Sequence, residues 1–86
     1  MNRILKVSGA EVAMAPADPE KGYSLAQLKD AIGGGYIEIV RLGRGKILVV
    51  DEEGWLKPLP LNITASALAG QAIAGDALLC DDKDVQ

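Results

Sequence analysis

The sequence predicts an α+β fold, a mixed or antiparallel sheet of four or five strands with one main helix packed across it. Short aliphatic segments bounded by turn residues recur along the chain, as is typical of strands. One segment between them instead has apolar residues at helical spacing behind a helix-capping signal. We expect a single domain over residues 1–81 and a solvated acidic C-terminal tail over residues 82–86.

The N-terminal residues predict a β-hairpin. Residues 3–7 are mostly aliphatic and are expected to form a strand, and residues 11–15 return as its partner after a turn at residues 8–10. Residues 16–22 contain two prolines and a glycine among charged residues, so we expect a loop there.

The next segment carries the clearest signal in the sequence, a helix over residues 25–32. Ser24 followed by Gln27 fits a capping box, in which each side chain accepts a hydrogen bond from the other residue's backbone N–H. Leu28 belongs to an apolar stripe at helical spacing. Three glycines at residues 33–35 end the helix, because glycine adopts the left-handed capping conformation without steric cost.

A second hairpin follows the helix. Residues 36–42 predict a strand, residues 43–45 a three-residue loop, and residues 46–51 the partner strand. The partner strand is apolar at successive positions, which indicates burial on both faces of the sheet. Residues 55–57 are expected to form a short further strand that ends before Pro58.

The last part of the domain predicts a short helix and a closing strand. Asn62 is the expected cap of a helix over residues 63–69, which Gly70 ends, and residues 77–81 form the closing strand. The expected element order is therefore ββαββ(β)αβ. It resembles the order of a β-grasp domain such as ubiquitin, a likeness of fold that carries no function.

Composition and charge exclude several classes of partner. The net charge of −3, from nine Lys and Arg against twelve Asp and Glu, lacks the basic balance that phosphate contacts require, so we expect no nucleic-acid partner. No apolar run approaches the roughly 18 residues of a membrane span, so we expect no membrane partner. The single cysteine cannot form an internal disulfide and no signal-peptide core is present, so we expect a cytoplasmic protein.

No residue pattern predicts catalysis, a cofactor site or a metal site, so we expect that the protein is not an enzyme. Ser24 has no histidine to act as its base and is interpreted as a helix cap. The glycines at residues 33–35 follow a helix, whereas a phosphate loop precedes one. The acidic run at residues 51–53 lacks the spacing of a calcium loop and is interpreted as a charged turn. Cys80 lies in an apolar strand and is interpreted as an inert buried thiol.

Two features are candidate interaction sites. The first is a cluster of basic residues around the predicted hairpin tip, Arg41, Arg44 and Lys46, which could bind a phosphate or an acidic partner. The alternative is that these side chains are only solvated, as is common for charged hairpin tips. Trp55 is the one tryptophan of the chain, and this residue type is enriched at binding hot spots. For Trp55 we favour packing at the edge of the aliphatic core, with contact to a partner as the alternative.

Four segments occur together in a known family. They read GGYIEIV at residues 34–40, LVVDEEG at residues 48–54, LPLN at residues 59–62 and IAGDALL at residues 73–79. On these segments the chain resembles, over residues 1–81, a family of small domains of unknown function encoded by bacteriophages, plasmids and bacterial genomes. That family has no established activity, so the resemblance implies a mobile-element setting and a bacterial cytoplasm and nothing further.

Two functional hypotheses follow, and the oligomeric state stays open. The first is a non-enzymatic interaction module, an accessory protein of a phage or plasmid that binds an unknown protein partner through a sheet edge or the region of Trp55. The alternative is a small-ligand binding protein, for example one that sequesters a nucleotide and holds its phosphates at the basic hairpin tip. Neither hypothesis requires a cofactor.

Overall fold

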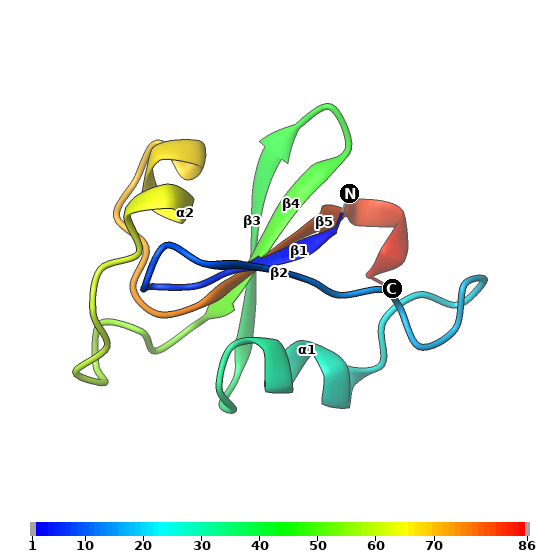
Figure 1. Cartoon of the computed structure of the whole chain (residues 1–86), viewed down its shortest axis with the longest axis horizontal. Coiled ribbons are helices and arrows are strands. Elements are labelled where there is room, and N and C mark those ends of the chain that lie inside the picture. Colours follow the sequence, from blue (N-terminus) through cyan, green and yellow to red (C-terminus); the bar gives the residue numbers. More distant parts are fainter. Residues whose placement is uncertain (1, 86) are drawn as a thin grey trace.

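A helix covers each face of a five-stranded sheet in the computed structural model, which describes residues 2–85 (Figure 1). The strands are β1 (Arg3–Leu5), β2 (Glu11–Ala13), β3 (Ile37–Gly43), β4 (Lys46–Asp51) and β5 (Ala77–Asp81). The helices are α1 (Leu25–Ala31) and α2 (Ile63–Ala69), and a short 3-10 helix, η1 (Asp82–Asp84), follows β5. The strand order is β2-β1-β5-β4-β3, and every neighbouring pair is antiparallel. Residue 1 of the predicted domain and residue 86 of the predicted tail lie outside the described residues.

This architecture confirms the predicted α+β fold and shows that the sheet is antiparallel. The predicted third strand at residues 55–57 is wrong, because the chain forms turns there. Leu56 and Lys57 both donate backbone hydrogen bonds to the Glu53 carbonyl, as in a helical turn, and both edges of β4 are already paired. The resemblance to a β-grasp domain is limited to element order. That fold pairs its first and last strands in parallel, whereas β1 and β5 are antiparallel here.

The N-terminal hairpin is shorter than predicted. β1 ends at Leu5 and β2 ends at Ala13, two residues before each predicted end. The shortening of β1 has a local cause, because the Lys6 N–H donates to the Ala10 carbonyl and the chain turns directly after Leu5. The bounds of α1 and β3 differ from the predictions by one residue, and those of β4, α2 and β5 agree with them.

The core has two layers, one on each face of the sheet, and β4 contributes to both. Ile47 and Val49 face α1, whereas Leu48 and Val50 face α2, and all four are at most 4% exposed. The prediction that this strand is covered on both faces is therefore confirmed. The α1 layer comprises Tyr23, Leu28, Ala31, Ile32, Ile47, Val49, Leu78 and Cys80, and the α2 layer comprises Leu5, Leu48, Val50, Ala65, Ile73 and Ala77.

The predicted helix caps are present. The Ser24 Oγ accepts from the Gln27 N–H at 3.1 Å, and the Gln27 side-chain oxygen accepts from the Ser24 N–H at 3.3 Å. At the other end of α1, the Gly34 N–H donates to the Lys29 carbonyl. The glycines after α1 therefore cap carbonyl groups, as predicted. Gly70 ends α2 with a φ of 67° in the left-handed region.

The acidic C-terminal end is partly docked, which corrects the expectation of a solvated tail. Asp82 is exposed, but the Asp84 carbonyl accepts a hydrogen bond from the Tyr23 N–H at 2.8 Å, and Val85 packs against the α1 layer. The Asp84 carboxylate also accepts from the Asn2 side-chain amide at 2.9 Å. Residues 2 and 84, from opposite ends of the described chain, are thus in direct contact.

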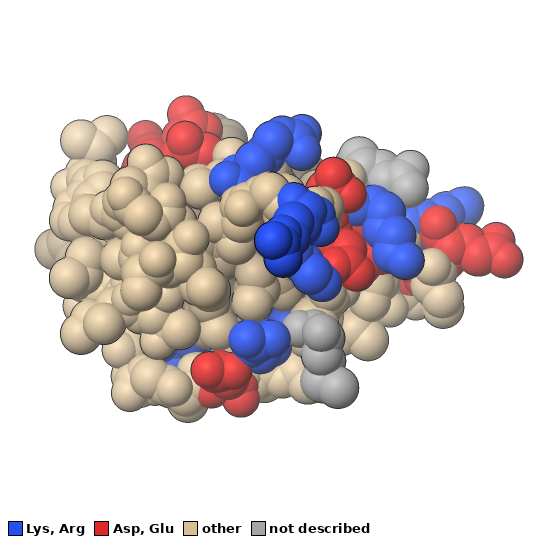
Figure 2. Space-filling view, turned by 90° about the horizontal axis from the view of Figure 1, so that it is seen from above, with Lys and Arg blue, Asp and Glu red and all other residues tan. Residues whose placement is uncertain are grey.

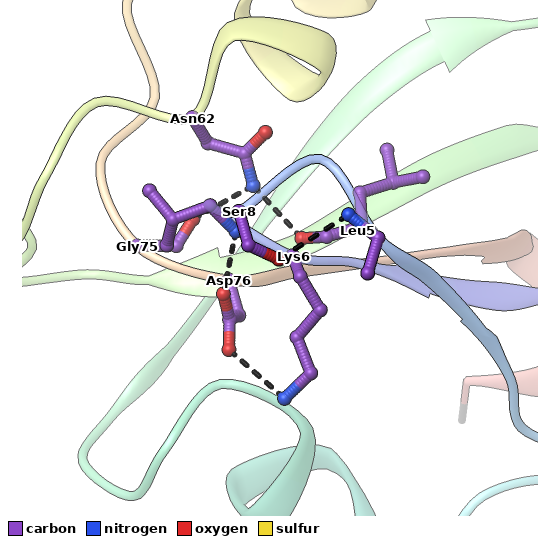
Figure 3. Close-up of polar contacts among 8 residues, drawn as sticks. Leu5, Lys6, Ser8, Asn62, Gly75 and Asp76 are labelled. Atoms are coloured by element: carbon purple, nitrogen blue, oxygen red, sulfur yellow. Dashed lines mark hydrogen bonds and ion pairs between the residues drawn. The ribbon is translucent and has the colours of Figure 1, made fainter.

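The side chain of Asn62 joins α2 to two strand ends (Figure 3). Asn62 is fully buried. Its Oδ1 accepts from the Ala65 N–H at 3.0 Å, which is the predicted helix cap, and its Nδ2 donates to the carbonyls of Leu5 at 2.8 Å and Gly75 at 2.9 Å. One side chain therefore satisfies three backbone groups in a place that water does not reach.

Asp76 holds the neighbouring turn of the first hairpin (Figure 3). Its Oδ1 accepts from the Val7 N–H at 2.9 Å, and its Oδ2 pairs with the Lys6 Nζ at 3.3 Å. Asp76 directly precedes β5, and Lys6 and Val7 directly follow β1. The end of the sheet at which β1 stops and β5 starts is therefore tied by side chains as well as by the strand ladder.

The substitution Asn62→Ala should lower the free energy of unfolding by about 3–7 kcal/mol. It removes a helix cap worth about 1 kcal/mol and leaves two buried carbonyls unsatisfied, at about 1–3 kcal/mol each. Urea unfolding followed by circular dichroism measures the change. Ser24→Ala is the matched control, because it removes an exposed cap alone and should cost about 1 kcal/mol. Equal losses in the two variants would show that Asn62 acts only as a cap.

Burial raises the pKa of the Cys80 thiol to about 12, and Cys80 is 1% exposed. The pKa of a cysteine thiol in the unfolded chain is about 8.5. In the alkaline range the unfolded state therefore releases a proton that the native state keeps, and the free energy of unfolding should fall as pH rises from about 9 toward 12. Burial also raises the pKa of Tyr23, which adds to the fall at higher pH.

Urea unfolding at a series of pH values tests this alkaline dependence. The fall should begin near about pH 9 in the native chain and later in Cys80→Ala, which keeps only the contribution of Tyr23. Identical pH profiles for the two proteins would contradict the assignment.

Candidate functional site

The Trp55 loop, defined as residues 52–58, exposes two apolar side chains. Trp55 is 65% exposed and Leu56 is 83% exposed. The expectation that Trp55 packs at the edge of the core is therefore wrong. The residue lies in a turn between β4 and α2 that projects away from the sheet (Figure 1).

A buried carboxylate holds the Trp55 loop in one shape. The Asp51 Oδ1 accepts from the Glu53 N–H at 2.8 Å, and its Oδ2 pairs with the Lys57 Nζ at 2.7 Å, while the Asp51 side chain is 2% exposed. Gly54 lies so close to the segment after α2 that an added Cβ would be 3.1 Å from the Ala74 carbonyl oxygen. The loop is thus fixed at its base, and its two apolar side chains are not used in fixing it.

Acidic and apolar side chains surround Trp55. Trp55, Glu38 of β3 and Glu52 line a cavity of about 150 Å³ between the loop and the segment that follows α2. Val50 and Ile73 contribute apolar walls to the same cavity. The exposed tryptophan therefore lies beside a small cavity that carboxylates and apolar side chains line together.

On the side of α2, the surface next to the Trp55 loop carries no charged residue over residues 58–75, which include α2. Figure 2 shows that the end of the molecule where α2 lies is largely free of charged residues, whereas charges of both signs gather at the other end. Leu61, Ile63 and Leu68 are 48%, 76% and 48% exposed there. Exposed apolar side chains gathered in this way are typical of a contact surface.

The structure separates the predicted basic cluster. Arg44 and Lys46 line one groove together with Arg3 of β1. Arg41 lies on the opposite face, where its guanidinium is 3.8 Å from the Asp82 carboxylate. The separation follows from strand geometry, because alternate residues of β3 face α1 and α2 and Arg41 falls in the set that faces α1.

The groove, called here the hairpin groove, lies on the α2 face of the sheet beside the β3–β4 hairpin and has a volume of about 410 Å³. Its lining includes three leucines and three basic residues, which are Leu42, Leu68, Leu79, Arg3, Arg44 and Lys46. Leu42 and Leu79 are half-buried and pack against the α2 layer. The groove is therefore an open continuation of the core with cations at its edge.

Two of the three cations in the hairpin groove form ion pairs. The Arg3 Nε is 2.6 Å from the Glu11 carboxylate. Lys46 pairs with Asp81, and the hydrogen bond from Lys46 lowers the pKa of Asp81. Arg44 is exposed and makes no ion pair within residues 2–85. Its guanidinium is the cation of the groove that is available to a ligand without breaking an existing pair.

Arg44 also occupies an unusual backbone position. The hairpin turns over two residues, Arg44 and Gly45, at φ values of 56° and 75°, and not over the predicted three-residue loop. Gly43 instead belongs to β3, at an irregularity in the strand register. Turns with two positive φ values favour asparagine or glycine at the first position. Among residues 2–85, Arg44 is the one residue other than glycine with a positive φ.

The other residues considered from the sequence serve the fold. Ser24 caps α1, Asp51 holds the Trp55 loop as part of the predicted charged turn, and Cys80 is buried. Within residues 2–85, no three His, Cys, Asp or Glu side chains come together in a way that suits a metal ion. No helix in the same range is long and apolar enough to cross a membrane.

Sequence reasoning missed Arg3 as a groove residue and Asp51 as the side chain that holds the Trp55 loop. No local signal identifies Arg3, because it reaches the groove through the pairing of β1 with β5 and of β5 with β4. Asp51 did carry a signal, since an aspartate at the start of a turn commonly accepts from the N–H two residues on.

A comparison with protein-family models matches residues 1–86 to a domain of unknown function (DUF3846). No curated protein and no solved structure matches the chain significantly. The match agrees with the resemblance seen in the sequence, while the phage or plasmid setting stays a prediction.

The substitution Arg44→Asn should raise the free energy of unfolding by about 1 kcal/mol, because asparagine tolerates the left-handed backbone that costs other residues about 1–2 kcal/mol. Arg41→Asn is the matched control, since it removes the same charge from an extended strand position and should not stabilise the protein. Urea unfolding of both variants gives the comparison. If the Arg44→Asn variant were less stable than the native chain, the inference that the backbone is strained at this position would be wrong.

Proposed function

The chain belongs to the DUF3846 family, a domain of unknown function, so the family supplies no activity for this protein. We propose from the exposed surface that the protein is a non-enzymatic protein-interaction module that docks through the Trp55 loop. In line with the resemblance stated from the sequence, the module would serve a phage or plasmid as an accessory protein. The observation that carries the proposal is the exposure of Trp55 and Leu56 on a loop whose shape does not depend on them.

Exposure of this kind favours binding because the apolar area is removed from water only when a partner covers it. A small domain with few aromatic residues would normally bury its one tryptophan in the core. Here the core is complete without Trp55, since neither layer includes it. The unfavourable free energy of exposing Trp55 and Leu56 to water would be recovered when a partner covers both side chains.

The fixed base of the loop supports tight binding. A flexible loop loses conformational entropy when it binds, and that loss reduces affinity. The two hydrogen-bonded oxygens of Asp51 and the close approach of Gly54 to Ala74 restrict the loop before any partner arrives. Most of the free energy gained by burying Trp55 and Leu56 would therefore appear as binding affinity.

The charges beside the loop indicate the chemistry of the partner. Glu38 and Glu52 line the cavity at Trp55, and Glu53 is the next residue of the loop. Carboxylates at this edge favour basic side chains on the partner and disfavour phosphates. The partner we propose is therefore a protein that offers an apolar pocket bordered by Lys or Arg.

The test compares capture of a partner by the native chain and by the double variant Trp55→Ser, Leu56→Ser. A tagged chain is used to capture proteins from bacterial lysate, and a captured protein is identified, purified and titrated by calorimetry. We expect affinity to fall at least about tenfold in the double variant, because a buried tryptophan anchor contributes about 2 kcal/mol or more. Glu52→Lys with Glu53→Lys should also weaken binding, more strongly at low salt.

Tyr36→Ser is the matched control. Tyr36 is 66% exposed, so it resembles Trp55 in exposure and aromatic character but lies outside the loop. This variant should bind as the native chain does, and circular dichroism should show all variants folded. If every captured protein bound the double variant as tightly as the native chain, the proposal would be wrong.

A further inference from the structure

We propose that the hairpin groove is a second binding site, for a small ligand that carries one anionic group on an apolar body. This site is distinct from the Trp55 loop, because the cavity at Trp55 and the hairpin groove share no lining residue. The argument rests on the apolar floor of the groove, on its cations and on the conformation of Arg44.

The floor of the groove suits an apolar body. Leu42, Leu68 and Leu79 come from β3, α2 and β5, and they are partly exposed because α2 covers only the other part of this face. A volume of about 410 Å³ lies within the range of small-molecule sites. A ligand in the groove would extend the α2 layer of the core, as an additional side chain would.

The cations at the edge suit an anionic group. Arg3, Arg44 and Lys46 come from the first strand, the hairpin turn and the fourth strand, so three separate segments bring positive charge to one place. The pairs of Arg3 with Glu11 and of Lys46 with Asp81 are partly exposed. Exposed pairs contribute little stability, so an anion can share these cations at small cost. Arg44 could bind an anion without breaking any ion pair.

The backbone of Arg44 is consistent with a role in binding. The turn holds a residue with a β-carbon where asparagine or glycine would be more stable. Strained positions of this kind are concentrated at functional sites. The left-handed conformation is also part of the turn that carries the guanidinium at the edge of the groove.

The same charges limit the class of ligand. Glu11 and Asp81 lie beside Arg3 and Lys46, so the groove edge carries three cations and two carboxylates. This balance favours one anionic group and disfavours a chain of phosphates. Two sources share the single anionic group, a nucleoside monophosphate with its flat aromatic base and a fatty-acid carboxylate with its alkyl chain, and the experiment separates them.

The experiment titrates the full chain with four probes and follows backbone amide signals by NMR. The probes are adenosine 5′-monophosphate, octanoate and their uncharged counterparts, adenosine and octanol. We expect at least one anion to shift the amides of residues 43–46 together with those of β1 and β5, and its uncharged counterpart to bind at least about tenfold more weakly. The anion that binds identifies the source.

Arg44→Gln and Arg41→Gln form a matched pair that tests the role of the groove. Both remove one positive charge from the same hairpin, but Arg44 lies at the groove and Arg41 on the opposite face. Arg44→Gln should weaken binding of the anion about tenfold, and Arg41→Gln by less than about twofold. Equal weakening by the two variants, equal binding of charged and uncharged probes, or no binding of either anion would each overturn the proposal.

Discussion

The buried amide of Asn62 is the interaction on which the arrangement of this domain depends. It lies where α2 begins, where β1 ends and where β5 is about to start, and it satisfies one backbone group of each segment. Without it, three segments distant in sequence would meet with unpaired polar groups in a dry interior. The α2 layer of the core is therefore much less stable without this one side chain.

Three side chains share this task at the same end of the sheet. Asn62 positions α2, Asp76 holds the first hairpin turn, and Asp51 shapes the Trp55 loop. Their polar atoms are committed to the backbone or to a lysine. These polar groups define the fold and are separate from the two surfaces left for binding. One surface is the exposed Trp55 loop with carboxylates beside it, and the other is a groove with cations at its edge.

Much of the fold could be predicted from local sequence patterns, whereas the two proposed binding surfaces could not. The capping box at Ser24, the cap at Asn62 and the aliphatic run of β4 involve residues close in sequence, and each was predicted. The exposure of Trp55 depends on a contact between Asp51 and Lys57 that replaces the expected strand by a turn. The division of Arg41 from Arg44 depends on a two-residue turn and a register shift, and the Gly-Arg-Gly sequence at residues 43–45 did not reveal either of them.

The strand order has a consequence for how the protein is made. β5 is the last strand to be synthesised, yet it lies between β1 and β4 in the middle of the sheet. The two hairpins can form early as separate units, but no ladder connects them until β5 enters. A nascent chain from which residues 77–81 have not yet emerged from the ribosome therefore carries two unjoined hairpins with open edges. Cooperative folding of this sheet must wait for these residues.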